Sequence, residues 1–188
     1  MSAFLQFEEA LRAFQSFANR NNLRFAIIGG VATILNGVDR RTQDINVALW
    51  VETAEVEKTI RNLLASGFRS RVENPESFAR VNRMALLEVG GVEVDVSLAL
   101  LPFEEGFINQ AQMLELTPEL TVPIASPESL IAMKLVAHRP QDVLDAVKLL
   151  ELFPTLNKRS ILENVVEFGM ALENPEMIES SRKILGFI

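Results

Sequence analysis

Cysteine is absent from the chain, and histidine occurs once, as His138. Without thiols the protein has no disulfides, thiolate zinc sites, iron–sulfur clusters or cysteine nucleophiles. A single imidazole also excludes His-rich metal clusters and leaves only one conceivable base for a serine triad. His138 falls at the end of a predicted helix, where an interaction with the helix dipole is the simpler interpretation. Any chemistry must therefore use carboxylates, amides, hydroxyls, lysine or arginine.

Long apolar runs are lacking as well. No stretch reaches the roughly 18 apolar residues that a membrane span needs. The first residues, MSAFLQFEEA, lack the basic start and apolar centre of a secretory signal. We therefore expect a cytoplasmic protein that does not contact a membrane.

Positive charge is scarce in the second half of the chain. The formal net charge is −7; residues 1–98 hold 11 Lys and Arg against 12 Asp and Glu, and residues 99–188 hold 7 against 13. An extended nucleic-acid surface needs clustered cations to neutralise phosphates, so we expect none here. One small anionic ligand, held locally, is compatible with this balance.

The chain contains 188 residues, of which 48% are hydrophobic and 23% charged, as in soluble globular domains with a sizeable core. Hydrophobic periodicity predicts helices over residues 3–20, 31–36, 53–65, 127–138, 140–153, 157–172 and 175–185. It predicts strands over residues 25–28, 42–51, 68–72, 84–89 and 92–98, the last two joined by a Gly90-Gly91 turn.

Four prolines interrupt the pattern between residues 101 and 127, namely Pro102, Pro118, Pro123 and Pro127. We expect irregular chain there, with one short helix. The chain is accordingly divided into a core over residues 1–100, a linker packed on it over 101–126, and a helical subdomain over 127–188.

Polar side chains recur on one face of two predicted strands. Alternation along the strand that contains Asp44 and Asn46 sends both away from the apolar face, about 6.5–7 Å apart. Asp95 has the same place on a later strand, with Glu93 as its alternative on that face. Carboxylate and amide oxygens at this spacing suit a divalent cation such as Mg²⁺. Upstream, Gly29-Gly30 offers unobstructed backbone before a helix, which is typical of a phosphate site.

The order of these pieces resembles the nucleotidyltransferase superfamily of polymerase-beta type. The resemblance lies in Gly29-Gly30, Arg-Thr-x-Asp-Ile-Asn over residues 41–46, and Asp95 within Val-Glu-Val-Asp-Val over 92–96. A later segment, residues 134–145, resembles a Lys…Ala…Arg-x-x-Asp-x-x-Asp helical motif. Small abortive-infection and toxin–antitoxin nucleotidyltransferases are the nearest likeness, over about residues 20–155.

The resemblance implies an α+β fold, with a small mixed sheet flanked by helices, and transfer of a nucleoside monophosphate from an NTP to a hydroxyl with Mg²⁺ or Mn²⁺. Metal binding and catalysis would fall to Asp44, Asn46 and Asp95, the last also acting as base. Nucleotide contacts would come from Gly29, Gly30, Arg41, Thr42 and Lys134. Arg139, Asp142 and Asp145 would be mostly scaffolding, and an antitoxin-like regulator would be a protein partner.

Two residues depart from the family pattern. Asn46 stands where a second acid is usual, and an amide adds no negative charge opposite two dications. Gly30 stands where a serine is often found, so no hydroxyl is offered to the phosphate. Three functions therefore stay open: an enzyme with a thinner metal site, a catalytically silent fold that binds a nucleotide or a protein, and a purely structural interaction module. Four further arginines, Arg69, Arg71, Arg80 and Arg83, could form a local contact with a polyanion, but the interleaved acids Glu73 and Glu76 favour a mixed, solvated face.

Overall fold

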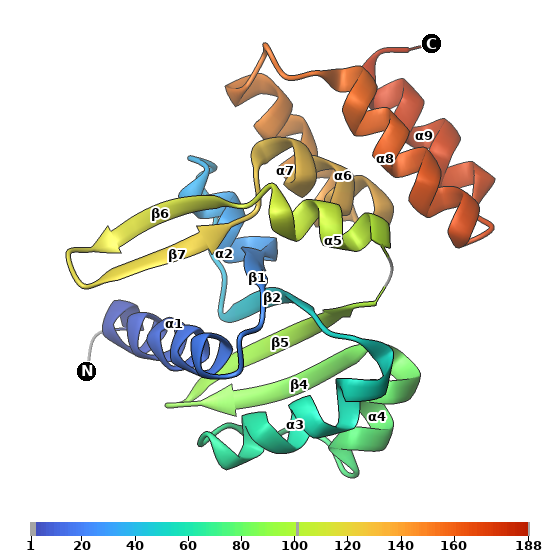
Figure 1. The fold of residues 1–188 in the computed structure, drawn as a ribbon. Coiled ribbons are helices and arrows are strands. Elements are labelled where there is room, and N and C mark those ends of the chain that lie inside the picture. The colour runs from blue at the N-terminus through green and yellow to red at the C-terminus, as the bar shows by residue number, and fades with distance from the viewer. Residues whose placement is uncertain (1–2, 101, 188) are drawn as a thin grey trace. The chain divides into compact units, whose positions relative to one another are not determined.

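The computed structural model describes residues 3–100 and 102–187 of the chain (Figure 1). The chain forms two compact units. The first contains Met1–Val31 and Arg41–Ala125, and the second contains Ala32–Arg40 and Ser126–Ile188.

The first unit is built on a seven-stranded mixed sheet with the order β3-β4-β5-β2-β1-β7-β6. Its strands are β1 (Phe25–Ile28), β2 (Asp44–Trp50), β3 (Arg69–Ser70), β4 (Met84–Val89), β5 (Val92–Ala99), β6 (Gln112–Thr117) and β7 (Leu120–Ile124). Two neighbouring pairs are parallel, β2 with β5 and β1 with β7, and the others are antiparallel. Helices that pack on a mixed sheet place the fold in the α+β class, as predicted.

One face of this sheet carries the apolar side chains that strand alternation predicts. Ile45, Val47 and Leu49 of β2 are fully buried there. A cluster of phenylalanines continues this core, with the rings of Phe14 and Phe25 5.2 Å apart between centroids. The helices of this unit are α1 (Ala3–Arg20), a 3₁₀ turn (Thr53–Glu55), α3 (Val56–Ala65), α4 (Pro75–Asn82) and α5 (Pro102–Asn109). Burial of the alternate strand residues leaves the intervening positions for the opposite face.

The opposite face is half apolar and half polar. Toward the carboxyl end of β2, Ala48 packs with Ala26, Ala99 and Ile108, and Ile108 belongs to α5. The positions of β2 that precede Ala48 on this face are Asp44 and Asn46, which are only partly buried. The polar residues at the start of β2 therefore adjoin a packed apolar layer. That layer holds the backbone of the strand in place.

Several predicted elements of the first unit need correction. The segment over 101–126, predicted to be irregular apart from one helix, contains α5 and the antiparallel hairpin of β6 and β7. Helix α4 was not predicted, and the strand expected over 68–72 is reduced to the two residues of β3. Helix α2 (Gly29–Leu35), whose residues are divided between the two units, begins at Gly29 rather than after the glycine pair.

The second unit is helical, as predicted for the end of the chain. Its helices are α6 (Pro127–Ala137), α7 (Pro140–Leu152), α8 (Lys158–Ala171) and α9 (Pro175–Leu185). Ser126 caps α6, its hydroxyl accepting a hydrogen bond from the Ser129 N–H, and Pro127 takes the first helical position. Helix α6 buries Leu130, Ile131 and Leu135, and α8 and α9 lie side by side (Figure 1).

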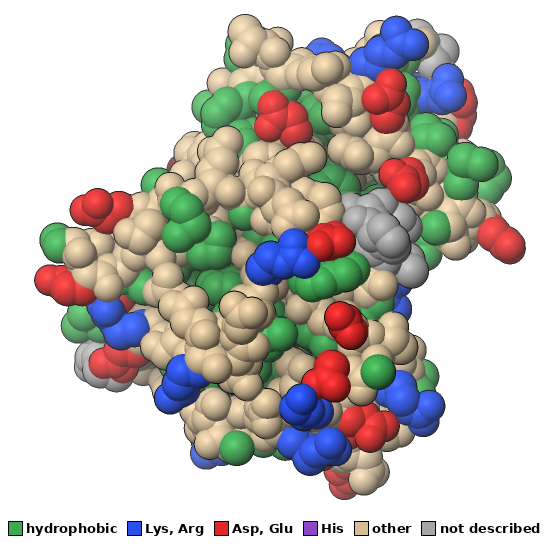
Figure 2. Space-filling model, in the orientation of Figure 1, with side chains coloured by type: hydrophobic (Ala, Val, Ile, Leu, Met, Phe, Trp, Pro, Cys, Tyr) green, Lys and Arg blue, Asp and Glu red, His purple; other side chains and the backbone are tan. Residues whose placement is uncertain are grey.

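The surface mixes charges of both signs. On the face drawn in Figure 2, lysine and arginine side chains lie among aspartate and glutamate side chains, with apolar and neutral surface between them. Among the helices that the structure describes, none is both long enough and apolar enough to cross a membrane.

Candidate functional site

The polar face of the sheet brings four oxygen-bearing side chains together. Strands β2 and β5 run parallel in a register that sets Asp44 opposite Glu93 and Asn46 opposite Asp95. Residues paired across neighbouring strands project from the same face, and such strands lie about 4.8 Å apart. These four residues, which we call the acidic row, form a two-by-two patch on the sheet.

Hydrogen bonds hold the Asp44 carboxylate at one end of the acidic row. The Thr42 hydroxyl donates to its Oδ1 and Asn46 Nδ2 donates to its Oδ2, each at 2.7 Å. Thr42 therefore orients Asp44.

Gly29 lies against Asn46 at the end of β1. Ile28 pairs with Asn46 across the β1–β2 ladder, and the next residue, Gly29, has a φ of +62°. A Cβ added at Gly29 would lie 2.8 Å from the Cβ of Asn46, which is closer than side chains approach each other. Glycine is required here both for the backbone conformation and for space. The turn thereby places the Gly29 backbone directly against Asn46 of the acidic row.

Asp95 is paired with an arginine rather than left open. Arg71, just after β3, forms ion pairs with Asp95 through one guanidinium nitrogen and with Glu93 through another. Burial raises the pKa of Asp95, Arg71 opposes that rise, and the nearby charges of Asp44 and Glu93 add to it. The other carboxylate oxygen of Asp95, Oδ2, accepts no hydrogen bond from the residues that the structure describes. A raised pKa makes Asp95 a better base than an ordinary aspartate.

The donor set fits one divalent cation. Mg²⁺ is commonly held by one or two carboxylates together with water and substrate phosphates, and Asp44 and Asp95 can provide those carboxylates. Within residues 3–100 and 102–187, no group of three or more His, Cys, Asp or Glu side chains could hold a metal ion. A second dication finds no further acid in the row, because Asn46 is neutral and Glu93 is paired with Arg71.

Lys134 belongs to a buried charge network in the second unit. Its side chain is almost fully buried, and its ammonium lies 2.7 Å from Asp145 Oδ2 and 3.4 Å from Asp142 Oδ1. Arg40 also pairs with Asp145, and Arg139 pairs with Asp142. Moving Lys134 toward a phosphate would remove a counter-ion from buried carboxylates, which is costly. The contacts favour the scaffolding role that the resemblance implies for Asp142 and Asp145, and extend it to Lys134.

The remaining predicted residues lie near the acidic row in the chain. Arg41 is exposed and immediately precedes Thr42, and Gly30 is buried in the first turn of α2.

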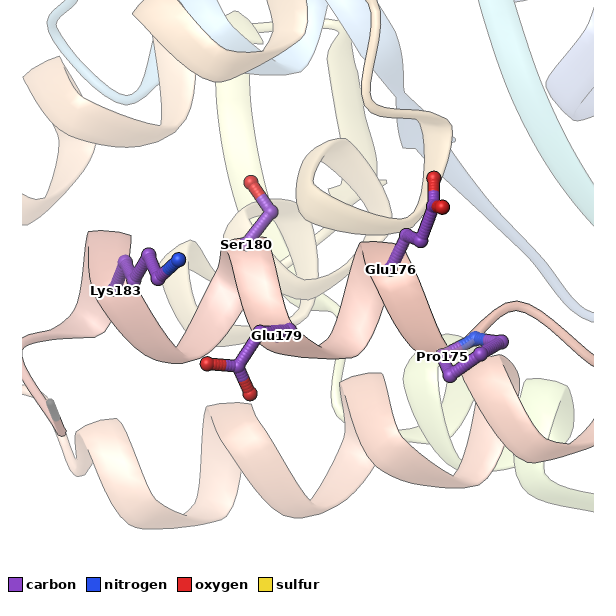
Figure 3. A pocket seen from close by; sticks show the side chains of 5 residues that line it. All are labelled: Pro175, Glu176, Glu179, Ser180 and Lys183. Carbon is purple, nitrogen blue, oxygen red and sulfur yellow. The ribbon is translucent and has the colours of Figure 1, made fainter.

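A surface hollow of about 410 Å³ lies on α9 and is lined by Pro175, Glu176, Glu179, Ser180 and Lys183. Figure 3 shows that these side chains point in different directions, with Glu179 opposite Glu176 and Ser180. They do not converge on a common point, and none of them belongs to the acidic row. The hollow therefore adds nothing to the site.

Arg71 is the site residue that the sequence did not reveal. It was grouped with three other arginines on a predicted solvated face, but only a quarter of its side chain is exposed and it pairs with two acids. Its proximity to Asp95 depends on the register of β3, β4 and β5, which pairs Ser70 with Leu87 and Leu86 with Asp95. Local composition carries no signal of that register.

Solved structures of similar fold are nucleotidyltransferases. The antibiotic-resistance factor ANT(2'')-Ia matches with a TM-score of 0.58 at 19% identity, over 90% of this chain and 95% of that chain. The lincosamide antibiotic adenylyltransferase LnuA, with lincomycin bound, matches with a TM-score of 0.51 at 17% identity, over 77% of this chain and 97% of that chain. An antigenic nucleotidyltransferase-like protein from Paracoccidioides brasiliensis has a TM-score of 0.50 at 19% identity, over 93% and 92% of the two chains. At these identities the likeness shows the fold.

No curated protein matches the chain. A family model described as "Nucleotidyltransferase of unknown function (DUF6036)" matches residues 3–160, a span that contains the sheet, Gly29, the acidic row and the buried charge network. The chain therefore belongs to this family of nucleotidyltransferases.

Proposed function

We propose that the protein transfers a nucleoside monophosphate from an NTP to a hydroxyl group, with Mg²⁺ or Mn²⁺ bound at the acidic row. The observation that carries the proposal is the convergence of Asp44, Asn46 and Asp95 on one sheet face beside the glycine turn at Gly29. Family membership indicates the class of reaction. The oxygen donors of the acidic row would bind the dication that contacts the nucleotide's phosphates.

The chemistry can be written with this chain's own residues. The acceptor hydroxyl oxygen bonds to the α-phosphorus, the bond from that phosphorus to the bridging oxygen breaks, and pyrophosphate leaves. Asp95 takes the hydroxyl proton on Oδ2, since Oδ1 is held by Arg71. Backbone at Gly29 and Gly30, with Arg41, faces the triphosphate, and Thr42 orients Asp44. A bound dication would supply charge neutralisation at the phosphates, which usually accounts for most of the rate enhancement in phosphoryl transfer.

Known relatives suggest the class of acceptor. One structure of ANT(2'')-Ia contains adenylyl-2''-tobramycin, and it matches with a TM-score of 0.55. LnuA is a lincosamide adenylyltransferase. A small molecule with several hydroxyl groups is therefore the first acceptor class to test, followed by a protein side chain and an RNA end.

A catalytically silent nucleotidyltransferase fold is the second candidate. It is favoured by one observation: Asn46 donates a hydrogen bond to Asp44, so this pair is satisfied without any cation. Such a fold would bind a nucleotide or a protein and transfer nothing.

One comparison separates the two candidates. Binding of ATP, GTP, CTP and UTP and release of pyrophosphate are measured with Mg²⁺ and with Mn²⁺, in the presence of hydroxyl acceptors of the three classes. The chains compared are the native protein, Asp44→Ala, Asn46→Asp and the control Asp39→Ala, which removes an exposed aspartate upstream. Transfer by the native chain that Asp44→Ala abolishes and Asp39→Ala preserves supports the enzyme. Nucleotide binding without transfer, with activity appearing only in Asn46→Asp, supports the silent fold. No nucleotide binding rejects the enzyme and a silent fold that binds nucleotides.

The biological setting is a finer part of the proposal. Resemblance to toxin–antitoxin and abortive-infection nucleotidyltransferases suggests a gene pair in which a small regulator controls this protein. Since nucleoside triphosphates are cytoplasmic metabolites, the reaction would take place in the cytoplasm. Inspection of neighbouring genes tests the pairing: an adjacent small regulator gene supports it, and a consistently isolated gene contradicts it.

A further inference from the structure

Arg71 brings a positive charge into the acidic row through two ion pairs. Two of its guanidinium nitrogens engage two acids, Glu93 and Asp95, which follow each other at i and i+2 on β5. The same i, i+2 spacing separates Asp44 and Asn46 on β2. The row thus consists of two pairs of side chains with the same spacing, and Arg71 forms ion pairs with both members of the pair on β5.

The position of this guanidinium is fixed by the sheet. The backbone N–H of Arg71 donates to the Leu86 carbonyl at 2.9 Å, and its Nε donates to the Leu87 carbonyl at 3.1 Å. The side chain therefore crosses β4 with its Nε anchored on that strand and its two terminal nitrogens on β5. Arginine suits this task because its planar, permanently charged fork can bond several acceptors at once.

Charge balance distinguishes this site from one built for two dications. Glu93, Asp95 and Asp44 carry three negative charges and Arg71 carries one positive charge, so the side chains sum to minus two. One dication neutralises that sum. With an acid at position 46 and a neutral residue at position 71, the sum would be minus four, which matches two dications. The amide of Asn46 and the guanidinium of Arg71 each make the summed charge of the site less negative than in that two-dication arrangement.

We propose that Arg71 is a resident cation that takes the electrostatic place of a second metal ion, so that the site binds a single dication between Asp44 and the free oxygen of Asp95. This inference rests on the proposed function for the identity of the site as a nucleotide site. Arg71 is a positioning residue: it acts through Asp95, by holding Oδ1 and leaving the two lone pairs of Oδ2, one for the dication and one for the acceptor proton.

Mn²⁺ binding tests the inference directly, because Mn²⁺ takes the same carboxylate oxygens as Mg²⁺ and its free form is counted by electron paramagnetic resonance. The full chain is titrated with Mn²⁺ alone and with Mn²⁺ plus α,β-methylene-ATP, which cannot be cleaved between its α- and β-phosphates. The variants are Arg71→Met, Arg71→Lys and the double variant Asn46→Asp with Arg71→Met. Arg69→Met is the matched control, since Arg69 pairs with Glu88 at the exposed edge of the same sheet.

The native chain and Arg69→Met are expected to bind one Mn²⁺ per nucleotide, and the double variant two. With Mn²⁺ alone, Arg71→Met should bind roughly tenfold more tightly than the native chain, as expected when one nearby and partly screened positive charge is removed. Arg71→Lys keeps the charge and should stay near native. Two Mn²⁺ ions in the native chain, or no difference between Arg71→Met and Arg69→Met, would overturn the inference.

Two checks keep the result interpretable. Melting of Arg71→Met in EDTA and in Mn²⁺ shows whether the cation replaces the guanidinium. Mn²⁺ should raise the melting temperature of Arg71→Met more than that of Arg69→Met, because it binds the former more tightly, and equal responses count against the inference. If the native chain binds no nucleotide at all, the proposed function fails, and the titration with Mn²⁺ alone still decides whether Arg71 occupies a cation position.

Discussion

Asn46 Nδ2 lies 2.7 Å from Asp44 Oδ2, to which it donates a hydrogen bond. The amide stands where the family resemblance implies a second acid. An acid at this position would bring two negative charges together and would need a cation between them, whereas the amide satisfies its neighbour directly. A single side chain therefore removes one need for a cation between these two positions.

Replacing Asn46 by aspartate should make the protein's stability depend on metal. Asn46→Asp loses the hydrogen bond to Asp44 and adds a like charge, so in EDTA the free energy of unfolding should fall by about 1–3 kcal/mol. Mg²⁺ or Mn²⁺ should restore it, as measured by urea denaturation. Gln43→Glu adds the same charge at an exposed neighbouring position and should show neither effect. Equal behaviour of the two variants would contradict this role of the amide.

A side chain at Gly29 should disturb the glycine turn. Gly29→Ala places a Cβ 2.8 Å from that of Asn46 at a φ of +62°, so we expect a loss of about 1–3 kcal/mol in unfolding free energy. Nucleotide affinity should fall with it. Gly106→Ala is the control, because Gly106 lies in α5 and a Cβ there meets no atom of the described chain within 4 Å. A Gly29→Ala variant as stable as the control would show that the close approach is wrong.

Asp145 should make the free energy of unfolding depend on pH in the acid range. Burial alone would raise the pKa of Asp145, but hydrogen bonds from Lys134 and Gln141 and the charges of Lys134 and Arg40 outweigh it and hold that pKa below its ordinary value of 3.8. The unfolded state therefore binds its proton at higher pH than the folded state. The stabilisation is complete above the ordinary carboxyl pKa and is lost as the pH falls through the lowered folded value.

Asp145→Asn tests this linkage. Removing one partner of a buried pair should cost about 3–5 kcal/mol at neutral pH. Below the ordinary carboxyl pKa the stability of native protein and variant should converge, as followed by denaturant titrations at a series of pH values. Asp39→Asn, at an exposed position, should follow the native curve. A constant difference between native protein and Asp145→Asn across the acid range would refute the assignment.

A variant of Lys134 distinguishes a scaffolding role of this side chain from a contact with the triphosphate. Its ammonium is held by Asp142 and Asp145 and its side chain is almost fully buried, so Lys134→Met should lower the unfolding free energy by about 3–5 kcal/mol. Nucleotide affinity, measured under conditions where the variant is folded, should change little. A stable variant with lost affinity would instead restore Lys134 as a triphosphate contact.

Much of the candidate site followed from strand alternation. The pattern around Ile45 and Val47 is buried on one side only, so Asp44 and Asn46 had to project from the other side. The turn at Gly90-Gly91 likewise predicts the hairpin of β4 and β5, which carries Asp95. Helix starts such as Ser126-Pro127 were equally legible, because cap and first-turn preferences are local.

Other parts of the fold could have been inferred but were not. In β7 the residues Leu120, Val122 and Ile124 alternate and are buried, yet Pro123 between them suggested irregular chain. Asn74-Pro75-Glu76 begins α4 with the same type of signal as the later helices. Arg71 is a different case, since its ion pairs depend on strand register across three strands, which no local pattern contains.

Binding of a nucleotide over Asp44, Asn46 and Asp95 is the central claim. The most direct measurement is the anomalous difference map of crystals grown with Mn²⁺ and α,β-methylene-ATP. We predict a manganese peak in contact with the carboxylates of Asp44 and Asp95, with the triphosphate beside Gly29. A nucleotide bound elsewhere on the chain, or crystals in which the ion pair of Arg71 with Asp95 is intact and this sheet face carries neither metal nor phosphate, would contradict it.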